Sequence, residues 1–323
     1  MSLLLAVDKQ PGMSSHDVVN RCRRIFGERR VGHTGTLDPL ASGLLPICIG
    51  PATRLDKYLA GHDKEYRVTI GFGYETTTDD MCGDVTVACA IPERLSDESY
   101  AAAYLESLVG EHEQMPPQFS AIKVNGVKSY EAARKGKSVD LAARRISILK
   151  ANLVEVRLDL ENGALCWDAV FRVSKGTYIR SIARDIGREL GTRAHVRALR
   201  RLASGRMDIR EAHSLEDIER KGRDSAIDPV RALGFRFAIA DDLEHKVNAG
   251  NALECERLVI HEAPHGDFED TMRAESPHDG EFVSIVVGNT LKALYRFDSS
   301  SSLWKPDCVF SIGVDLPENG LIL

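Results

Sequence analysis

The sequence has no apolar run long enough to cross a membrane, since such a span needs about 20 consecutive apolar residues. The apolar stretch near the N-terminus, residues 3–7, is also too short for the core of a signal peptide. Aromatic residues make up only 6% of the chain, but 43% is hydrophobic and 28% is charged, which excludes a disordered chain. We therefore expect a folded cytoplasmic protein with no membrane partner.

Cysteines are few and scattered, with no CxxC pair and no Cys/His cluster at the spacing of zinc ligands. Their odd number argues against a disulfide framework, and we expect no metal site. Single buried thiols are the simplest interpretation, because a free cysteine packs as a small hydrophobic residue. The seven are Cys22, Cys48, Cys82, Cys89, Cys166, Cys255 and Cys308.

The length and the charge distribution both indicate two domains. A chain of 323 residues exceeds what one hydrophobic core usually supports. Residues 1–230 contain 34 Lys or Arg and 32 Asp or Glu, a net charge of +2, while residues 231–323 contain 8 and 16, a net charge of −8. The composition changes near Asp228-Pro229. We therefore predict one domain over 1–230 and a small β-rich domain over 231–323.

Basic residues concentrate in two clusters. Residues 171–210 hold 11 basic and 3 acidic residues, and arginine, which binds phosphate through a planar fork, predominates. Within residues 171–210, the segment 177–190 has apolar residues at helical spacing, with Arg180, Arg184 and Arg188 at every fourth position. This pattern indicates either a solvated helical face or a face that binds a polyanion. The second cluster comprises Arg21, Arg23, Arg24, Arg29 and Arg30.

The remaining patterns predict an α+β fold. Ser14 to Asp17 form a capping-box pattern before a short helix, and residues 65–72 alternate as a half-buried strand. Residues 154–160 and 165–173 predict two adjacent strands that turn at 161–163. The Gly- and Pro-rich segment 30–51 predicts a structured loop with one helical turn, and 264–280 predicts a mobile loop.

The most informative stretch is GHTGTLDPLASGLLP at residues 32–46. Its glycines allow backbone conformations that other residues rarely adopt, and Pro39 stiffens the chain directly after Asp38. An ordinary turn is one interpretation, because Asp-Pro often begins turns. A phosphate-binding loop is excluded, since no GK[ST] follows. The other interpretation is a site that holds one carboxylate in a fixed position.

Several motifs in order resemble the TruB-type tRNA pseudouridine synthases over about residues 4–230. In that family a proline usually follows the lysine directly, whereas here Gln10 stands between Lys9 and Pro11. The resemblance implies a mixed, mainly antiparallel sheet flanked by helices and loops, and a C-terminal domain of the PUA type. The motifs lie at residues 8–9, 12–15, 32–50, 64–68, 116–123, 174–180 and 194–202.

The resemblance implies an isomerase that converts a uridine in the T-loop of tRNA, position 55, to pseudouridine. It makes Asp38 the essential carboxylate, Tyr66 the ring that stacks on the base and accepts a proton, and Arg180 the partner of Asp38. Whether Asp38 attacks the sugar, adds to uracil or removes a sugar proton stays open. Further implied substrate-binding residues are Lys9, His33, Lys123, Lys175, Tyr178 and Leu199. Implied contacts with the RNA backbone are Arg184, Arg188, Arg197 and Arg200.

The implied reaction needs no metal or organic cofactor, because all its bonds lie within one nucleotide. We expect the T-arm of tRNA as partner, no guide RNA and a monomeric protein. One alternative is a non-catalytic factor that binds or folds tRNA with the same basic face. Another is the catalytic subunit of a guide-RNA-dependent complex, which the closer match to the stand-alone bacterial pattern disfavours.

Overall fold

The computed structural model describes residues 1–120, 122–124, 127–133, 136, 139–159, 164–263 and 276–317, with backbone alone for 123–124, 127–128 and 130–131. The chain forms two compact units. The first comprises Met1–Pro39, Gly43–Gly61 and Ala203–Leu323, and the second comprises Leu40–Ser42 and His62–Leu202. Among the described residues, no helix is long and apolar enough to cross a membrane.

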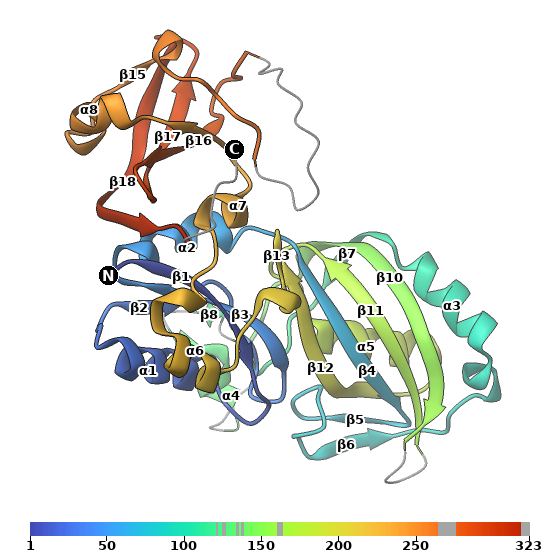
Figure 1. Cartoon of the computed structure of the whole chain (residues 1–323). Helices are drawn as coiled ribbons and strands as arrows, with labels where there is room; N and C mark the ends of the chain where they lie inside the picture. The colour runs from blue at the N-terminus through green and yellow to red at the C-terminus, as the bar shows by residue number, and fades with distance from the viewer. Residues whose placement is uncertain are drawn as a thin grey trace. The chain divides into compact units, whose positions relative to one another are not determined.

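The second unit is built on a sheet in the order β12, β4, β11, β10, β7, and the strands from β4 to β7 pair antiparallel. Buried positions on its central strands carry large apolar residues, such as Phe72 and Trp167, whose rings meet edge to face at 4.8 Å. Figure 1 shows α3 beside β10 and α5 against the sheet. The strands are β4 (Lys64–Phe72), β7 (Gly110–Gln114), β10 (Arg144–Leu158), β11 (Leu165–Val173) and β12 (Ala194–Ser204).

Shorter elements surround this sheet. A hairpin of β5 and β6 follows β4, and helix α5 begins directly after the loop that leaves β11. Helix α3 begins at an Asp97 cap, whose side chain accepts from the N–H of Tyr100. These elements are β5 (Tyr74–Thr76), β6 (Val85–Ala88), α3 (Glu98–Ser107), β8 (Lys123–Val124), β9 (Val127–Lys128), α4 (Ser129–Ala133) and α5 (Ile179–Glu189).

The N-terminal part of the first unit centres on β3, which pairs with β1 on one side and β2 on the other. After β12 the chain returns to the free edge of β1, where His213 and Ala226 form isolated bridges. Helix α6 then packs beside α1 (Figure 1). The elements are β1 (Leu3–Lys9), α1 (Ser15–Phe26), β2 (Val31–His33), β3 (Ser42–Ile49), α2 (Asp56–Leu59), β13 (Met207–Asp208), α6 (Leu215–Lys221) and α7 (Pro229–Leu233).

The C-terminal segment of the same unit forms the predicted β-rich sheet, in the order β14, β16, β17, β18, β15. One of its faces packs on α8 around Trp304 and Tyr295. The other joins the core of β1, β3 and α7 through residues such as Leu294 and Phe310. The elements are β14 (Arg236–Ile239), α8 (Glu244–Asn248), β15 (Leu253–Glu254), β16 (Phe282–Val287), β17 (Thr290–Asp298) and β18 (Leu303–Asp315).

The α+β class, the Ser14 capping box, the strand near 65–72 and the paired strands β10 and β11 are confirmed. The prediction of a loop across 30–51 is wrong, because residues 42–49 form β3. A proline inside a run suggests a loop, but Pro46 lies opposite Ala6 within β3. The domain boundary at residue 230 stays a prediction. The predicted turn at 161–163 and most of the predicted mobile loop lie outside the described residues.

Candidate functional site

The loop that carries Asp38 is fastened on both sides of this residue. On one side, Ser15 Oγ donates to the carbonyl oxygen of Leu37 at 2.9 Å and accepts from the Leu37 N–H at 2.8 Å. On the other side, the N–H of Gly12 donates to the carbonyl oxygen of Pro39 at 2.8 Å. Asp38 itself is half-buried. These contacts restrict the backbone on either side of the carboxylate, as the sequence predicts.

Lys9 stabilises the turn that hydrogen-bonds to this loop. Its side chain is fully buried, and its Nζ donates to the carbonyl oxygens of Met13 at 2.7 Å and Gln10 at 3.0 Å. A buried ammonium group is costly unless it is hydrogen-bonded, so these bonds stabilise the turn at 10–14. That turn presents the Gly12 N–H to Pro39. These contacts give Lys9 a supporting role in the turn, and its implied contact with substrate stays a prediction.

His33, at the end of β2, begins the loop. It is half-buried, and its Nδ1 accepts from the N–H of Gly35 at 3.3 Å. The next residue, Thr34, is buried, and its N–H donates to the carbonyl oxygen of Pro46 in β3 at 3.2 Å. The imidazole thus lies in the same fastened loop as Asp38. Its implied role as a substrate-binding residue stays a prediction.

Tyr66 lies in the second unit, on β4 opposite Phe171 of β11, and is 9% exposed. Lys64 precedes it by two residues and so points to the same side of the strand. Burial and the positive charges of Arg201 and Lys175 together lower the pKa of Lys64 to about 8, against the negative charge of Asp63, which raises it. Lys175, which the resemblance implies as a substrate-binding residue, is exposed. Lys64, Arg201 and Lys175 therefore bring positive charge close to the strand that carries Tyr66.

Arg180, in the first turn of α5, is 4% exposed and held by two backbone carbonyl groups. Its Nη1 donates to Thr78 O at 2.8 Å and its Nη2 to Phe119 O at 2.9 Å. Its Nε lies 3.9 Å from Asp80 Oδ2. These contacts fix the guanidinium group before any ligand arrives. Asp38 belongs to the other unit, and its pairing with Arg180 stays a prediction.

Tyr178 precedes α5 and is positioned by the buried Gln114 of β7. The Tyr178 N–H donates to Gln114 Oε1 at 2.8 Å, and Gln114 Nε2 donates to the Tyr178 carbonyl oxygen at 3.1 Å. The pair fixes the backbone from which α5 and Arg180 begin. The predicted Tyr178 is half-buried, and the side chain of the predicted Lys123 lies outside the described residues.

The arginine stripe of α5 faces carboxylates of the same unit. Arg184 is 7% exposed, and its Nη1 lies 3.0 Å from Asp79 Oδ2. Arg188 donates to both oxygens of Glu75, at 2.8 and 2.7 Å. Burial raises the pKa of Asp79 against the charge of Arg184, whereas the bonds from Arg188 lower the pKa of Glu75. Both arginines therefore have carboxylate partners within the protein, and their implied contacts with the RNA backbone stay predictions.

Strand β12 carries the other predicted RNA contacts. Arg197 is 9% exposed, and its Nη2 lies 3.0 Å from Asp159 Oδ2, so it also has an internal carboxylate partner. Arg200 is half-buried, with its Nη1 3.5 Å from Ser42 Oγ. The buried Leu199 accepts at its carbonyl oxygen from Ser42 Oγ at 3.5 Å. Arg197 thus pairs with a carboxylate of the same unit, and the implied RNA contacts of Arg197 and Arg200 stay predictions.

Sequence reasoning missed the carboxylates between β5 and β6. Asp80 accepts at its Oδ1 from Thr78 Oγ1 at 2.6 Å and from the N–H of Cys82 at 3.0 Å. The backbone of Asp79 is left-handed, with φ of 59°, which is uncommon outside glycine. The run of three threonines and two aspartates at 76–80 indicates a structured turn. Nothing in that run alone pairs it with a helix about one hundred residues later.

The cysteines agree only in part with the prediction of buried thiols. Cys22, Cys48, Cys166 and Cys308 are buried, whereas Cys82 and Cys89 are exposed and Cys255 is half-buried. Within the described ranges, no group of three or more His, Cys, Asp or Glu side chains could hold a metal ion.

Residues 23–179 match the model of the TruB family pseudouridylate synthase N-terminal domain, and residues 180–231 match that of the tRNA pseudouridylate synthase B C-terminal domain. The tRNA pseudouridine synthase B of Geobacillus thermodenitrificans is 39% identical over 260 residues, 78% of this chain and 86% of that protein. Its namesake from Bacillus pumilus is 39% identical over 296 residues, 90% and 94% of the two chains.

A chain in a solved H/ACA ribonucleoprotein bound to a substrate RNA containing 2'-deoxyuridine superposes with a TM-score of 0.65. The sequence identity is 22%, and the match covers 95% of this chain and 84% of that one. This likeness concerns the fold, and it agrees with the mixed sheet and the C-terminal β-rich segment described above.

Proposed function

Because this chain belongs to the TruB family of pseudouridylate synthases, we propose that it isomerises the T-loop uridine of tRNA at position 55, with Asp38 as the essential carboxylate. The chain is a tRNA pseudouridine synthase, an isomerase. The observation that supports Asp38 most is the fastening of its loop by Ser15 and Gly12 on either side. A reaction is faster when the reacting group is already held in position before the substrate binds, because less freedom is then lost on reaching the transition state.

In the proposed reaction the target base leaves the RNA stack, at a cost of a few kcal/mol. Stacking on an aromatic ring contributes about 1–3 kcal/mol per base, and Tyr66 would supply that ring. The N-glycosidic bond breaks, the uracil turns over, and it rejoins the ribose through carbon 5. The proton released from carbon 5 would pass to Tyr66.

Arg180 would pair with Asp38 when the target nucleotide binds. The two backbone carbonyl partners of Arg180 and the nearby Asp80 leave the guanidinium group in a fixed orientation. We propose a monomer in the cytoplasm that works on tRNA without a guide RNA.

The test is release of tritium from an unmodified tRNA transcript labelled at carbon 5 of uridine. Purified protein alone should release the label, and Asp38→Asn should abolish release while the affinity for tRNA stays nearly the same. Asp56→Asn is the matched control, because Asp56 is an exposed carboxylate of the same unit. A transcript with cytidine at position 55 should release nothing.

Persistent release by Asp38→Asn would contradict the catalytic role of Asp38. If the wild-type protein and the variant both bind tRNA and neither releases label, the non-catalytic tRNA-binding factor is the better description. Release from the transcript with cytidine at position 55 would contradict the proposed target position.

A further inference from the structure

Three exposed arginines lie at the C-terminal end of α1 and in the turn before β2. They are Arg24, Arg29 and Arg30. In the part of the chain that the structure describes, their guanidinium groups take part in no hydrogen bond or ion pair. They differ in this from Arg184, Arg188 and Arg197, which have carboxylate partners.

The turn that carries two of these arginines is held rigidly from inside. Arg23 Nε donates to the carbonyl oxygen of Arg29 at 3.1 Å, and Arg23 Nη2 donates to that of Val31 at 3.4 Å. The N–H of Gly50 donates to the carbonyl oxygen of Arg30 at 2.7 Å. Arg23 thus uses its guanidinium group to hold the backbone of the turn. The turn therefore presents its two arginines without a large loss of backbone freedom on binding.

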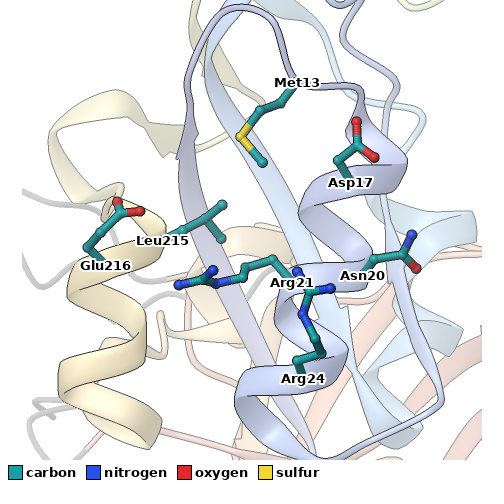
Figure 2. A pocket seen from close by; sticks show the side chains of 7 residues that line it. All are labelled: Met13, Asp17, Asn20, Arg21, Arg24, Leu215 and Glu216. Carbon is teal, nitrogen blue, oxygen red and sulfur yellow. The ribbon is translucent and has the colours of Figure 1, made fainter.

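A hollow between α1 and α6 adjoins this end of α1. Figure 2 shows that Arg21 reaches across it toward α6, while Arg24 stays along α1. Arg21 Nη2 lies 2.5 Å from Glu219 Oε2, so α6 neutralises this arginine and fixes α1 beside it. Arg24 forms no such ion pair with a carboxylate among the described residues.

The helix dipole explains one of the three arginines only. A cation in the last turn of a helix is favourable, and Arg24 occupies that turn. The effect falls off beyond the last turn, and Arg29 and Arg30 lie past Gly27, where the helix ends. The dipole therefore gives no reason for the two arginines in the turn.

We propose that Arg24, Arg29 and Arg30 bind backbone phosphates of the tRNA at a distance from the target nucleotide. The first turn of α1 holds the loop of Asp38 through Ser15, and α1 has 12 residues, so its far end lies roughly 18 Å from that turn. Helix α1 therefore sets the spacing between the target uridine and these phosphates. This inference rests on the proposed function, because it takes tRNA as the polyanion.

The experiment measures the affinity for full-length tRNA against salt concentration for a triple variant, Arg24→Gln, Arg29→Gln and Arg30→Gln. We expect weaker binding and a salt dependence whose slope falls by roughly 0.7–0.9 for each phosphate that the variant no longer neutralises. The single-turnover rate at saturating tRNA should not change. Each single substitution should lower the slope by the amount expected for one lost phosphate contact. Thermal unfolding checks that the variants fold.

The control removes the same charge from cations that already have carboxylate partners. It combines Arg210→Gln, Arg257→Gln and Lys305→Gln, whose partners are Asp208, Asp242 and Asp298. We expect a much smaller change in slope. A second RNA, the T-loop with only its closing base pairs, should bind the wild-type protein and the triple variant equally.

An unchanged salt slope for the triple variant overturns the inference. Two other results also overturn it: the triple variant binds both RNAs equally more weakly than the wild-type protein does, or the control variant loses as much affinity for tRNA as the triple variant. The outcome is independent of catalysis. If the wild-type protein releases tritium and the triple variant keeps full affinity for tRNA, only this inference fails. If no tritium is released but the triple variant loses affinity, only the proposed isomerase activity fails.

Discussion

Arg184 of α5 and Asp79 of the turn after β5 form a buried ion pair, with Arg184 Nη1 3.0 Å from Asp79 Oδ2. The two residues are more than one hundred positions apart in the sequence, and their side chains are only 9% and 12% exposed. Arg184 also donates to the carbonyl oxygen of Met115 at 2.9 Å. This guanidinium group therefore joins three segments of the second unit.

We expect Arg184→Gln to lower the free energy of unfolding by about 3–5 kcal/mol, because it leaves Asp79 buried without its partner. The loss should be greater at pH 7 than at pH 5. Burial raises the pKa of Asp79 and the charge of Arg184 lowers it, so without Arg184 this pKa rises further, and the variant loses more stability than the wild-type protein as the pH rises through it. Urea unfolding at the two pH values measures both effects. The double variant with Asp79→Asn should recover much of the loss; no recovery would contradict the pairing.

Ser15→Ala should lower the turnover rate of the proposed reaction, because it removes both hydrogen bonds to Leu37 beside Asp38. A misplacement of 1 Å can cost about 100-fold in rate, so we expect a loss between about 10-fold and 100-fold with unchanged affinity for tRNA. Tritium release under single-turnover conditions measures it. Ser14→Ala is the control, because it removes the helix cap and about 1 kcal/mol of stability but leaves the Ser15 contacts. An equal rate loss in both variants would argue against positioning by Ser15.

Asp307→Asn should loosen the attachment of β18 to α2. Lys57 Nζ lies 2.6 Å from Asp307 Oδ2, and Tyr58 Oη donates to the same oxygen. We expect a loss of about 1–3 kcal/mol in the free energy of unfolding at pH 7. Burial raises the pKa of Asp307, but the bonds from Lys57 and Tyr58 lower it more. The stabilisation is therefore present above the pKa of the unfolded state, and it is lost as the pH falls through the folded pKa.

Unfolding of the Asp307→Asn variant should be compared with the wild-type protein at pH 7 and at about pH 3. Asp242→Asn removes an exposed surface partner of Arg257 and should cost less than about 1 kcal/mol. A cost for Asp307→Asn no larger than this control, or one that persists unchanged in acid, would contradict the role of Asp307.

Lys64 should make stability rise with pH in the alkaline range. Its pKa is about 8 in the folded protein and about 10.4 in an unfolded chain, so the unfolded state binds more protons between these values. The wild-type protein should therefore gain stability relative to Lys64→Met as the pH rises from 8 to 10. Comparing the two proteins cancels the tyrosines and cysteines that titrate in the same range. A difference that is independent of pH would show that Lys64 is not buried as a charged group.

Local signals predicted the elements that depend on neighbouring residues. The capping box at Ser14 needs only residues within one turn, and the alternation in β4 needs one strand. One of the two interpretations of the Asp38 loop was a site that holds one carboxylate in a fixed position, and the hydrogen bonds from Ser15 and Gly12 agree with it. The identity of these two partners could not be predicted, because they lie more than 20 residues away.

Long-range partners account for what could not be predicted from the sequence. The stripe of arginines on α5 looks unbalanced until the turn at 75–80 brings Glu75 and Asp79 to it. Strand β3 was predicted as a loop because Gly and Pro are frequent in loops. The segment is nevertheless a strand, because it pairs with β1 and β2. In both cases the deciding contact comes from a different part of the chain.

The first unit is discontinuous, since its core joins Leu4 and Leu44 to Leu294 and Phe310. The second unit is almost one uninterrupted segment, His62–Leu202. On the ribosome, residues 62–202 can therefore complete their sheet while the N-terminal strands still wait for partners that have not been synthesised. Strand β1 packs with β18 in this core, so it can be fully enclosed only when β18 has left the exit tunnel, and translation of the last quarter of the chain sets the earliest moment at which the core of the first unit closes.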